Sequence, residues 1–409
     1  MTVDATAEPR PFPFNQADRL DIDPIYQELR ASEPMSRIKL PYGEGSAWLA
    51  TRYEDVRAIN ADPRLSRSAG RYRDDVPRMT RDDNKRPSII NTDPPDHTRL
   101  RRLVAKAFTA RRMEALRPRV QEMVRTSIDA MIAQGPPADL VSHLALPLPI
   151  GVICELLGVP YEDRDRFREW SDGVLSTTAL PPDEIQRCYT DLGTYLAGLV
   201  ARRREEPTDD LLGTLVAARD EGDKLSEQEL VVFGVTLLVA GHETTANQLG
   251  NFVYTLLTHP DQLAILERHP DLVPQAVEEL LRFIPLGSGG GFPRIATEDI
   301  EIAGVTVREG EAVFVSGPSA NRDAAAFDDP DTLDVTRTDN PHMAFGHGVH
   351  HCLGAQLARL ELCEALSAVV TRLPGLRMAA PEDELPWKLG LRVRGLRALP
   401  VAWDGIAHD

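Results

Sequence analysis

Residues 345–354 have the sequence FGHGVHHCLG, and this stretch decides the fold class. Its glycines, Gly346, Gly348 and Gly354, permit unusual backbone dihedrals and let the backbone approach a large flat ligand closely. Cys352 lies just before a helix predicted from about residue 353, where the dipole and free amides of the first turn stabilise a thiolate. The stretch suits a thiolate metal ligand, but for an isolated cysteine a buried residue in a glycine-rich turn is the simpler interpretation.

Every fixed position of this stretch matches the haem-binding loop of cytochromes P450, F-G-x-G-x-H-x-C-x-G, so the chain resembles that family. The resemblance implies that Cys352 is the ligand of the iron in haem b. It places Phe345, Gly346 and Gly354 in the cofactor-binding loop. It also implies the family's fold, mainly α with minor β sheets, as one triangular domain with a long central helix over the haem.

Four histidines near Cys352 raise a competing interpretation, a zinc site. Zinc sites usually gather several Cys or His residues at short fixed offsets, with a second pair farther along the chain. One cysteine lies here and no partner pair is evident, so the sequence favours haem. The histidines are His342, His347, His350 and His351.

Glu279 and Arg282 lie at positions i and i+3 of a predicted helix. Taken alone, such a pair is a common solvated ion pair that contributes little. Its place before the cysteine loop resembles the P450 E-x-x-R pair, which is buried and joins a downstream arginine. Arg337 occupies that downstream position, and the resemblance gives all three residues a structural role.

The sequence AGHETT at residues 240–245 interrupts a long apolar helix. Glu243 places a carboxylate in an apolar run, where it needs a partner or a raised pKa, and Thr244 can bend the helix through a backbone carbonyl. A kink with one solvent-facing acid is the simpler interpretation. The stretch matches the P450 pattern [AG]-G-x-[DE]-T-T, which implies that Glu243 and Thr244 relay protons to dioxygen. His242 fills the variable position.

Residues 93–102, DPPDHTRLRR, predict a helix start that resembles the bacterial P450 segment contacting the haem propionates. His97 and Arg101 share a face at i and i+4, and Arg can engage a carboxylate through two hydrogen bonds. The resemblance assigns both to the propionates. It assigns Arg294 and His350 to the family's other propionate positions.

The 409 residues contain no Gly/Ser linker, repeat or low-complexity stretch, which favours one large unit. We predict an irregular arm over residues 1–20 and a single P450 domain over residues 21–409. Alternation predicts strands over residues 38–51 and 300–315. Helical patterns cover residues 98–204, 225–259 and 355–373, with short strands in the tail.

Charge and cysteine use limit the functional class. The net charge of −17 argues against general nucleic-acid binding. The four cysteines are few and spread out, which is not a secreted disulfide framework. Residues 1–10 have no apolar signal core, and the longest apolar stretch, near residues 231–240, is too short for a bilayer. We expect a cytoplasmic protein without a membrane segment.

The resemblance implies a monooxygenase that inserts one atom of O₂ into a C–H or C=C bond of a small-molecule substrate. Electrons are expected from a ferredoxin and its reductase. The motifs are closest to P450s of secondary metabolism, including those acting on macrolide precursors. The glycines of residues 286–292 and the small residues of the central helix predict a roomy pocket for a bulky, mostly apolar ligand. Its expected lining residues are Phe233, Leu237, Ala240, Gly241, Leu286, Gly289, Gly290 and Phe292.

Two other classes of function remain open. The chain could serve as a haem-binding recruitment module without oxygenase activity, although the Glu243-Thr244 pair argues against that. It could also be a zinc or thiol hydrolase built on the histidine and cysteine cluster. An absorption spectrum separates these classes, since zinc is colourless.

Overall fold

The computed structural model of the protein describes residues 8–14, 19–79, 87–105, 108–176, 179–208, 210–220, 226–287 and 291–405. These residues form two compact units, each assembled from separate stretches of chain. The first unit draws on Met1–Thr98, Leu281–Leu333 and Thr338–Cys352, and the second on Arg99–Leu280, Asp334–Arg337 and Leu353–Asp409. The stretches of the two units alternate along the sequence.

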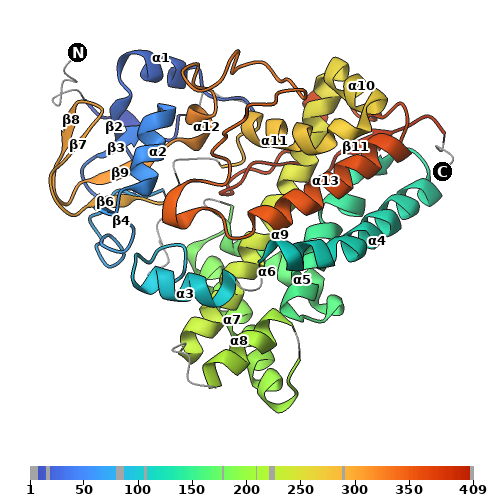
Figure 1. The fold of residues 1–409 in the computed structure, drawn as a ribbon, viewed down its shortest axis with the longest axis horizontal. Helices are drawn as coiled ribbons and strands as arrows, with labels where there is room; N and C mark the ends of the chain where they lie inside the picture. The colour runs from blue at the N-terminus through green and yellow to red at the C-terminus, as the bar shows by residue number, and fades with distance from the viewer. Residues whose placement is uncertain are drawn as a thin grey trace. The chain divides into compact units, whose positions relative to one another are not determined.

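The first unit is built on a six-stranded sheet (Figure 1). β2 and β3 form the antiparallel pair predicted for residues 38–51, with Met35 opposite Ala50. Successive residues of β3 pack into different buried clusters, Trp48 into one and Leu49 into the other, because side chains alternate along a strand. The strand order is β1 (Arg10–Pro11), β2 (Met35–Lys39), β3 (Ala47–Ala50), β9 (Ala312–Val315), β6 (Arg294–Ala296) and β4 (Leu65–Ser66).

Short helices and one hairpin complete the first unit. β7 (Ile300–Ile302) and β8 (Val305–Val307) pair antiparallel, which confirms the strands predicted between residues 300 and 315. The helices of this unit are α1 (Ile25–Ser32), α2 (Tyr53–Ala61), α12 (Gly317–Ala320) and the 3-10 turn η4 (Gly348–His350).

The predicted irregular arm is wrong at residues 10–11. Strand β1 pairs in parallel with β2, and Phe12 is buried in the cluster that contains Ile38 and Leu40. The sequence did not show this because the pairing depends on a distant strand rather than on a local pattern.

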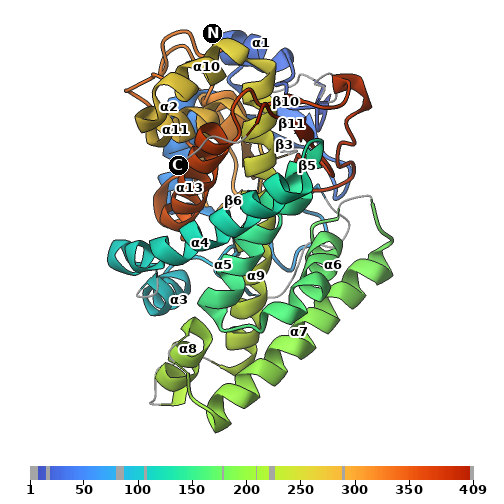
Figure 2. The same cartoon turned by 90° about the vertical axis from the view of Figure 1, so that its right-hand side faces the viewer.

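The second unit is organised around α9, Glu227–Thr258, the long helix predicted for residues 225–259. Its capping box is present: the Glu229 amide donates to the Ser226 hydroxyl, and the Ser226 amide donates to the Glu229 carboxylate. α10 begins at Pro260, directly after the helix ends. α9 packs against α5, α6, α7 and α13, so its buried side chains form much of this unit's core (Figure 2).

Helices α4, α5, α6, α7 and α13 of the second unit match the helical patterns predicted for residues 98–204 and 355–373, while α8 and α10 lie outside those ranges. Its helices are α4 (Ala110–Gln134), α5 (Pro147–Leu157), α6 (Arg164–Val174), α7 (Pro182–Glu205), α8 (Leu211–Asp220), α10 (Pro260–Arg268) and α13 (Ala355–Arg372). A small sheet joins β10 (Arg377–Met378), β11 (Pro400–Ala402) and β5 (Ala138–Asp139). None of the helices in the described ranges has the length and apolar character needed to cross a membrane.

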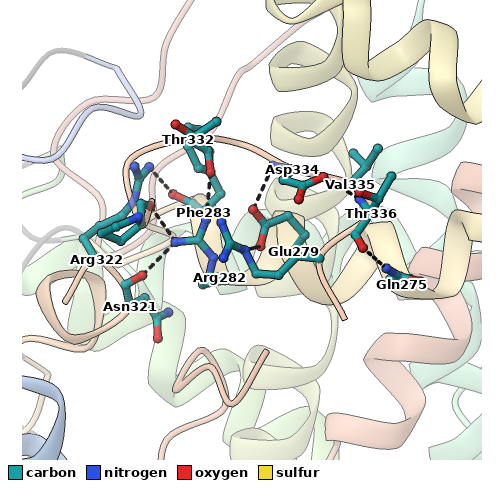
Figure 3. A network of polar contacts seen from close by, with 12 residues as sticks. Gln275, Glu279, Arg282, Phe283, Asn321, Arg322, Thr332, Asp334, Val335 and Thr336 are labelled. Carbon is teal, nitrogen blue, oxygen red and sulfur yellow. Dashed lines mark hydrogen bonds and ion pairs between the residues drawn. The ribbon is translucent and has the colours of Figure 1, made fainter. Parts of the chain in front are cut away.

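Helix α11, Val273–Phe283, carries Glu279 and Arg282, and both side chains are buried (Figure 3). The Glu279 carboxylate accepts from Arg337 Nε at 3.1 Å and from the Asp334 amide at 2.9 Å. Arg282 donates to the backbone carbonyls of Asn321, Pro330 and Thr332 at 2.6–3.1 Å. Glu279 and Arg282, less than one helix turn apart, therefore provide hydrogen-bond partners for backbone amides and carbonyls outside the helices and strands.

We expect Arg337→Met to destabilise the protein strongly, because it removes a cation that is paired with the buried Glu279 carboxylate. Breaking one partner of a buried pair costs about 3–5 kcal/mol. Urea unfolding followed by circular dichroism measures this loss as a lower midpoint. The matched control is Arg308→Met, which removes an exposed arginine paired with exposed Asp299. Similar midpoints for the two variants would contradict a scaffold role for the Glu279–Arg337 pair.

Candidate functional site

The loop that carries Cys352 is shaped by two glycines with positive φ angles. Gly346 and Gly348 both have φ of 72°, a region that disfavours residues with a Cβ. A Cβ at Gly348 would also lie 2.4 Å from the carbonyl oxygen of Asn60 on α2. Gly354 differs, because it caps α13 with φ of −87°. A hydrogen bond from the Cys352 amide to the Phe345 carbonyl, at 2.9 Å, joins the two ends of the loop. The Cys352 side chain is exposed.

Basic side chains from distant parts of the sequence meet in the first unit. The rings of His97 and His350 lie 4.4 Å apart between centroids, and His97 is buried. Arg294, at the start of β6, is buried and donates to the Asn60 side chain. Arg67 follows β4 and donates to the Ile90 carbonyl. We call Arg67, Arg294, His97 and His350 the cation cluster.

The electrostatics of the cation cluster show an excess of positive charge. Burial, together with the charge of Arg67, lowers the pKa of Arg294 to about 9. Burial, together with Arg67, His97 and Arg294, lowers the pKa of His350 to about 3, so its ring is neutral at pH 7 and the arginines carry the positive charge. The carboxylate of Asp93 opposes these effects. Its oxygens are already hydrogen-bonded to the Ser66 and Ser68 hydroxyls and the Arg67 amide, so the cluster favours an added anion.

Arg101 lies one turn after His97 on α3, Asp96–Ala105. Its side chain is partly buried. The predicted pairing of the two residues on one helix face follows from this spacing, while their contact with a propionate remains a prediction.

In the second unit, Glu243 and Thr244 point to different faces of α9. The Glu243 side chain is fully buried, and its Oε1 accepts from Lys388 Nζ at 2.5 Å and from Asn247 Nδ2 at 2.7 Å. Burial alone would raise the pKa of Glu243, but Lys388 and His242 outweigh burial and lower it. Thr244 is partly exposed and donates its hydroxyl to the Ala240 carbonyl at 2.7 Å. The two side chains are therefore adjacent in sequence and separated in orientation.

The residues predicted to line a substrate pocket differ in exposure and come from both units. On α9, Ala240 is exposed beside Thr244, while Phe233 and Leu237 are buried. In the first unit, Leu286 is partly buried, and Phe292 is 39% exposed under the guanidinium of Arg67. Gly289 and Gly290 lie outside the described residues.

Gly241 lies at a contact between helices, and its place in a substrate pocket stays a prediction. A Cβ at this position would lie 2.8 Å from Cδ1 of Ile153 on α5. The glycine therefore permits close packing of α5 against α9. The motif could not show this, since it does not say which helix packs on that side.

Sequence reasoning missed Arg67 and Lys388. Arg67 lies in LSRSAG, which matches no motif quoted above, and Lys388 lies far beyond the cysteine loop. Both reach their partners only through tertiary structure, Lys388 across 145 positions to Glu243. An unpaired carboxylate in an apolar helix predicted a partner for Glu243 but not its identity.

The zinc alternative finds no donor set in the described ranges. Among these residues, no group of three or more His, Cys, Asp or Glu side chains is arranged to hold a metal ion. A zinc hydrolase therefore has no support from the geometry of this part of the chain.

Comparison with known proteins decides the family. A family model for cytochrome P450 matches residues 184–268 and 268–374. Nocardicin C N-oxygenase of Nocardia uniformis subsp. tsuyamanensis is 53% identical over 96% of this chain and 98% of its own. Mycinamicin IV hydroxylase/epoxidase of Micromonospora griseorubida is 52% identical over 97% and 100%. The LnmA cytochrome P450 hydroxylase of the leinamycin pathway of Streptomyces atroolivaceus superposes with a TM-score of 0.90 at 55% identity, covering 96% and 100%.

The chain belongs to the cytochrome P450 family.

As a P450, the protein is a monooxygenase that uses haem and O₂. The residues present fit haem in two respects. The exposed Cys352 thiol is the ligand type of the P450 family, and the cation cluster supplies donors for two propionate carboxylates. Two anionic propionates would offset a positive charge excess of this kind.

For this P450 we expect Arg294→Leu to weaken haem retention while leaving the haem-free protein at least as stable. The variant removes a desolvated cation and so ends its charge repulsion with Arg67. It also removes a proposed hydrogen-bond donor to a propionate. A hydrogen bond to a charged group contributes about 1.5–3 kcal/mol, so haem loss should accelerate roughly tenfold or more. Transfer of haem to apomyoglobin measures this rate.

The control is Arg64→Leu, at an exposed arginine paired with Asp62 beside the same sheet. It should release haem at the wild-type rate. Wild-type retention in Arg294→Leu would remove Arg294 from the propionate site.

Proposed function

We propose that the protein is a haem b thiolate monooxygenase whose iron ligand is Cys352 and whose substrate is a bulky, mostly apolar natural product. The cation cluster carries this proposal, since it lies in the same unit as Cys352 and gathers basic side chains beside the carboxylate of Asp93, whose oxygens are already hydrogen-bonded. His97, Arg101, Arg294 and His350 would bind the propionates, as the sequence predicted.

When bound, haem supplies the activation of O₂ with two external electrons, which protein side chains cannot do. The chain's own residues then have three tasks. Cys352 donates its thiolate from a loop held by the Phe345 carbonyl. Thr244 presents its hydroxyl on the partly exposed face of α9, and Glu243 holds a carboxylate on the buried face. Ala240 keeps the exposed face free of bulk beside Thr244.

P450 enzymes generally receive electrons from redox partners, and we propose a ferredoxin with its reductase in the cytoplasm. The net charge of −17 does not favour an acidic partner, so docking needs a local basic surface. Arg102 on α3 and Arg111 and Arg112 on α4 are exposed and supply such charges.

The substrate class rests on the relatives. Their names include a nocardicin N-oxygenase, a mycinamicin hydroxylase/epoxidase and a leinamycin hydroxylase, so similar chains act on different natural products. We propose hydroxylation or epoxidation of a macrolide, polyketide or related compound in antibiotic biosynthesis. The glycines of residues 286–292 support a roomy pocket.

The proposed ligand is tested by the reduced, CO-bound spectrum. We expect a band at about 450 nm, the mark of a thiolate ligand that names the family, and its loss in Cys352→Ser. Serine variants of the other cysteines should keep the band. Burial raises the pKa of Cys154 to about 12 and that of Cys363 to about 11, so both stay thiols. A normal band in Cys352→Ser would overturn the assignment.

The proposed substrate class is tested by spin-state titration. A macrocyclic polyketide should produce a low-to-high-spin shift at lower concentration than a monoterpene. Gly289→Leu or Gly290→Leu should weaken macrocycle binding by filling space. Ala130→Leu, on an exposed position of α4, is the control and should bind normally. If the best ligand is the size of a monoterpene, the roomy pocket is contradicted.

A further inference from the structure

The carboxylate of Glu243 uses only one of its two oxygens. Oε1 accepts from Lys388 and Asn247, as described above. Oε2 is buried and has no hydrogen-bond partner among the described residues. Lys388 is itself held in place, because its amide donates to the Gly395 carbonyl at 2.8 Å within the loop before β11. The carboxylate is therefore fixed, with a lone pair aimed into the protein interior.

His242 faces this unused oxygen. Its Nδ1 lies 2.8 Å from the Leu238 carbonyl, which only accepts, so Nδ1 carries a hydrogen. In the neutral ring Nε2 is then an acceptor. Nε2 is buried, has no hydrogen-bond partner in the described part of the chain, and lies 3.9 Å from Glu243 Oε2. Two acceptors thus face each other with room for one proton between them.

The charges around this pair come from three elements. α9 contributes His242 and Glu243, α6 contributes Arg168 and Asp172, and the loop after α13 contributes Lys388 and Arg397. Burial lowers the pKa of His242; Lys388 and Arg168 lower it further, against the effect of Glu243.

Asp172 on α6 belongs to the same group of interacting charges as Glu243. Burial raises the pKa of Asp172, and the charge of Glu243 adds to this effect. Its Oδ1 is buried without a hydrogen-bond partner among the described residues. At neutral pH the cluster therefore holds a neutral imidazole and an ionised Glu243, and it can accept a proton.

We propose that His242 is a positioning residue of the oxygenase reaction: with Glu243 it forms a buried pair that holds one exchangeable proton, and Lys388 fixes the pair's orientation. This inference rests on the proposed monooxygenase function. Loading adds one solvent proton to Nε2 and produces an imidazolium. Discharge passes that proton to Oε2 and from there to the reaction, so the pair ends as it began. Each turnover of O₂ to water and product consumes two such protons from solvent.

Two substitutions separate this role from packing. His242→Asn keeps a donor for the Leu238 carbonyl and removes Nε2, and His242→Gln places an uncharged amide toward Oε2. Both should retain haem, the CO band and the substrate spin shift. Both should divert reductant to peroxide and lose product formation by about tenfold or more, the order of a positioned proton transfer. Thr244→Ala serves as the uncoupled reference.

The dependence on pH provides a readout that packing would not change. The lowered pKa of His242 means that the pair loads as pH falls below the ordinary histidine value of about 6.5. The share of electrons reaching product should therefore rise as pH falls in the wild type and stay flat in His242→Asn. Lys388→Met should move this rise to higher pH, because it removes the cation that opposes loading.

Nitrogen-15 NMR of the reduced, CO-bound holoprotein tests the pair without turnover. The His242 Nε2 resonance should titrate in the wild type, and Glu243→Gln should move its titration to lower pH. The control is His259→Asn at the end of α9, where Nδ1 makes the same contact with the Thr255 carbonyl at 2.8 Å. It should remove a different resonance and leave coupling unchanged.

The outcomes are distinct. Wild-type coupling at every pH in His242→Asn, or a His242 resonance that ignores Glu243→Gln, would overturn the proton-sharing pair. If His242→Asn does not fold, the NMR titration of the wild type and of Glu243→Gln decides the question. Absence of the CO band in the wild type would instead overturn the proposed function.

Discussion

The first unit is organised around the cation cluster, whose buried basic side chains need an anion beside them. Arg294 is buried beside Arg67 and the two histidines, and the nearby carboxylate of Asp93 is committed to Ser66 and Ser68. Buried charges of one sign are costly unless an opposite charge joins them. Two anionic propionates would offset this charge, as the proposed haem site requires. The same unit carries Cys352, whose side chain is exposed.

The two faces of helix α9 carry different kinds of side chain. Ala240 and Thr244 lie on its exposed side, joined by a hydrogen bond from hydroxyl to carbonyl. His242 and Glu243 lie on its buried side, where Lys388 compensates the carboxylate. A motif of six consecutive residues thus combines an alcohol on the exposed face with a buried acid, and helical geometry places them about 100° apart. The buried acid is held by Lys388, which lies outside the motif.

Local patterns predicted much of this architecture. The helical pattern over residues 225–259 located the start of α9 within two residues, at the place where Ser226 and Glu229 form a local capping box. The positive φ angles of Gly346 and Gly348 followed from a loop that only glycine can form. Arg67, Lys388 and the packing of Ile153 on Gly241 could not be predicted, since each depends on contacts between distant segments. Phe12 and β1 were missed for the same reason.

The most direct test of the account compares two ligands that differ only in charge. Haem-free protein is titrated with haemin and with haemin dimethyl ester, in which both propionates are neutral, and binding is followed by absorbance. The account predicts that the ester binds at least roughly tenfold more weakly, because each charge-assisted contact contributes about 1.5–3 kcal/mol. Equal affinity for the two compounds would show that the cation cluster does not hold the propionates, and would contradict the account.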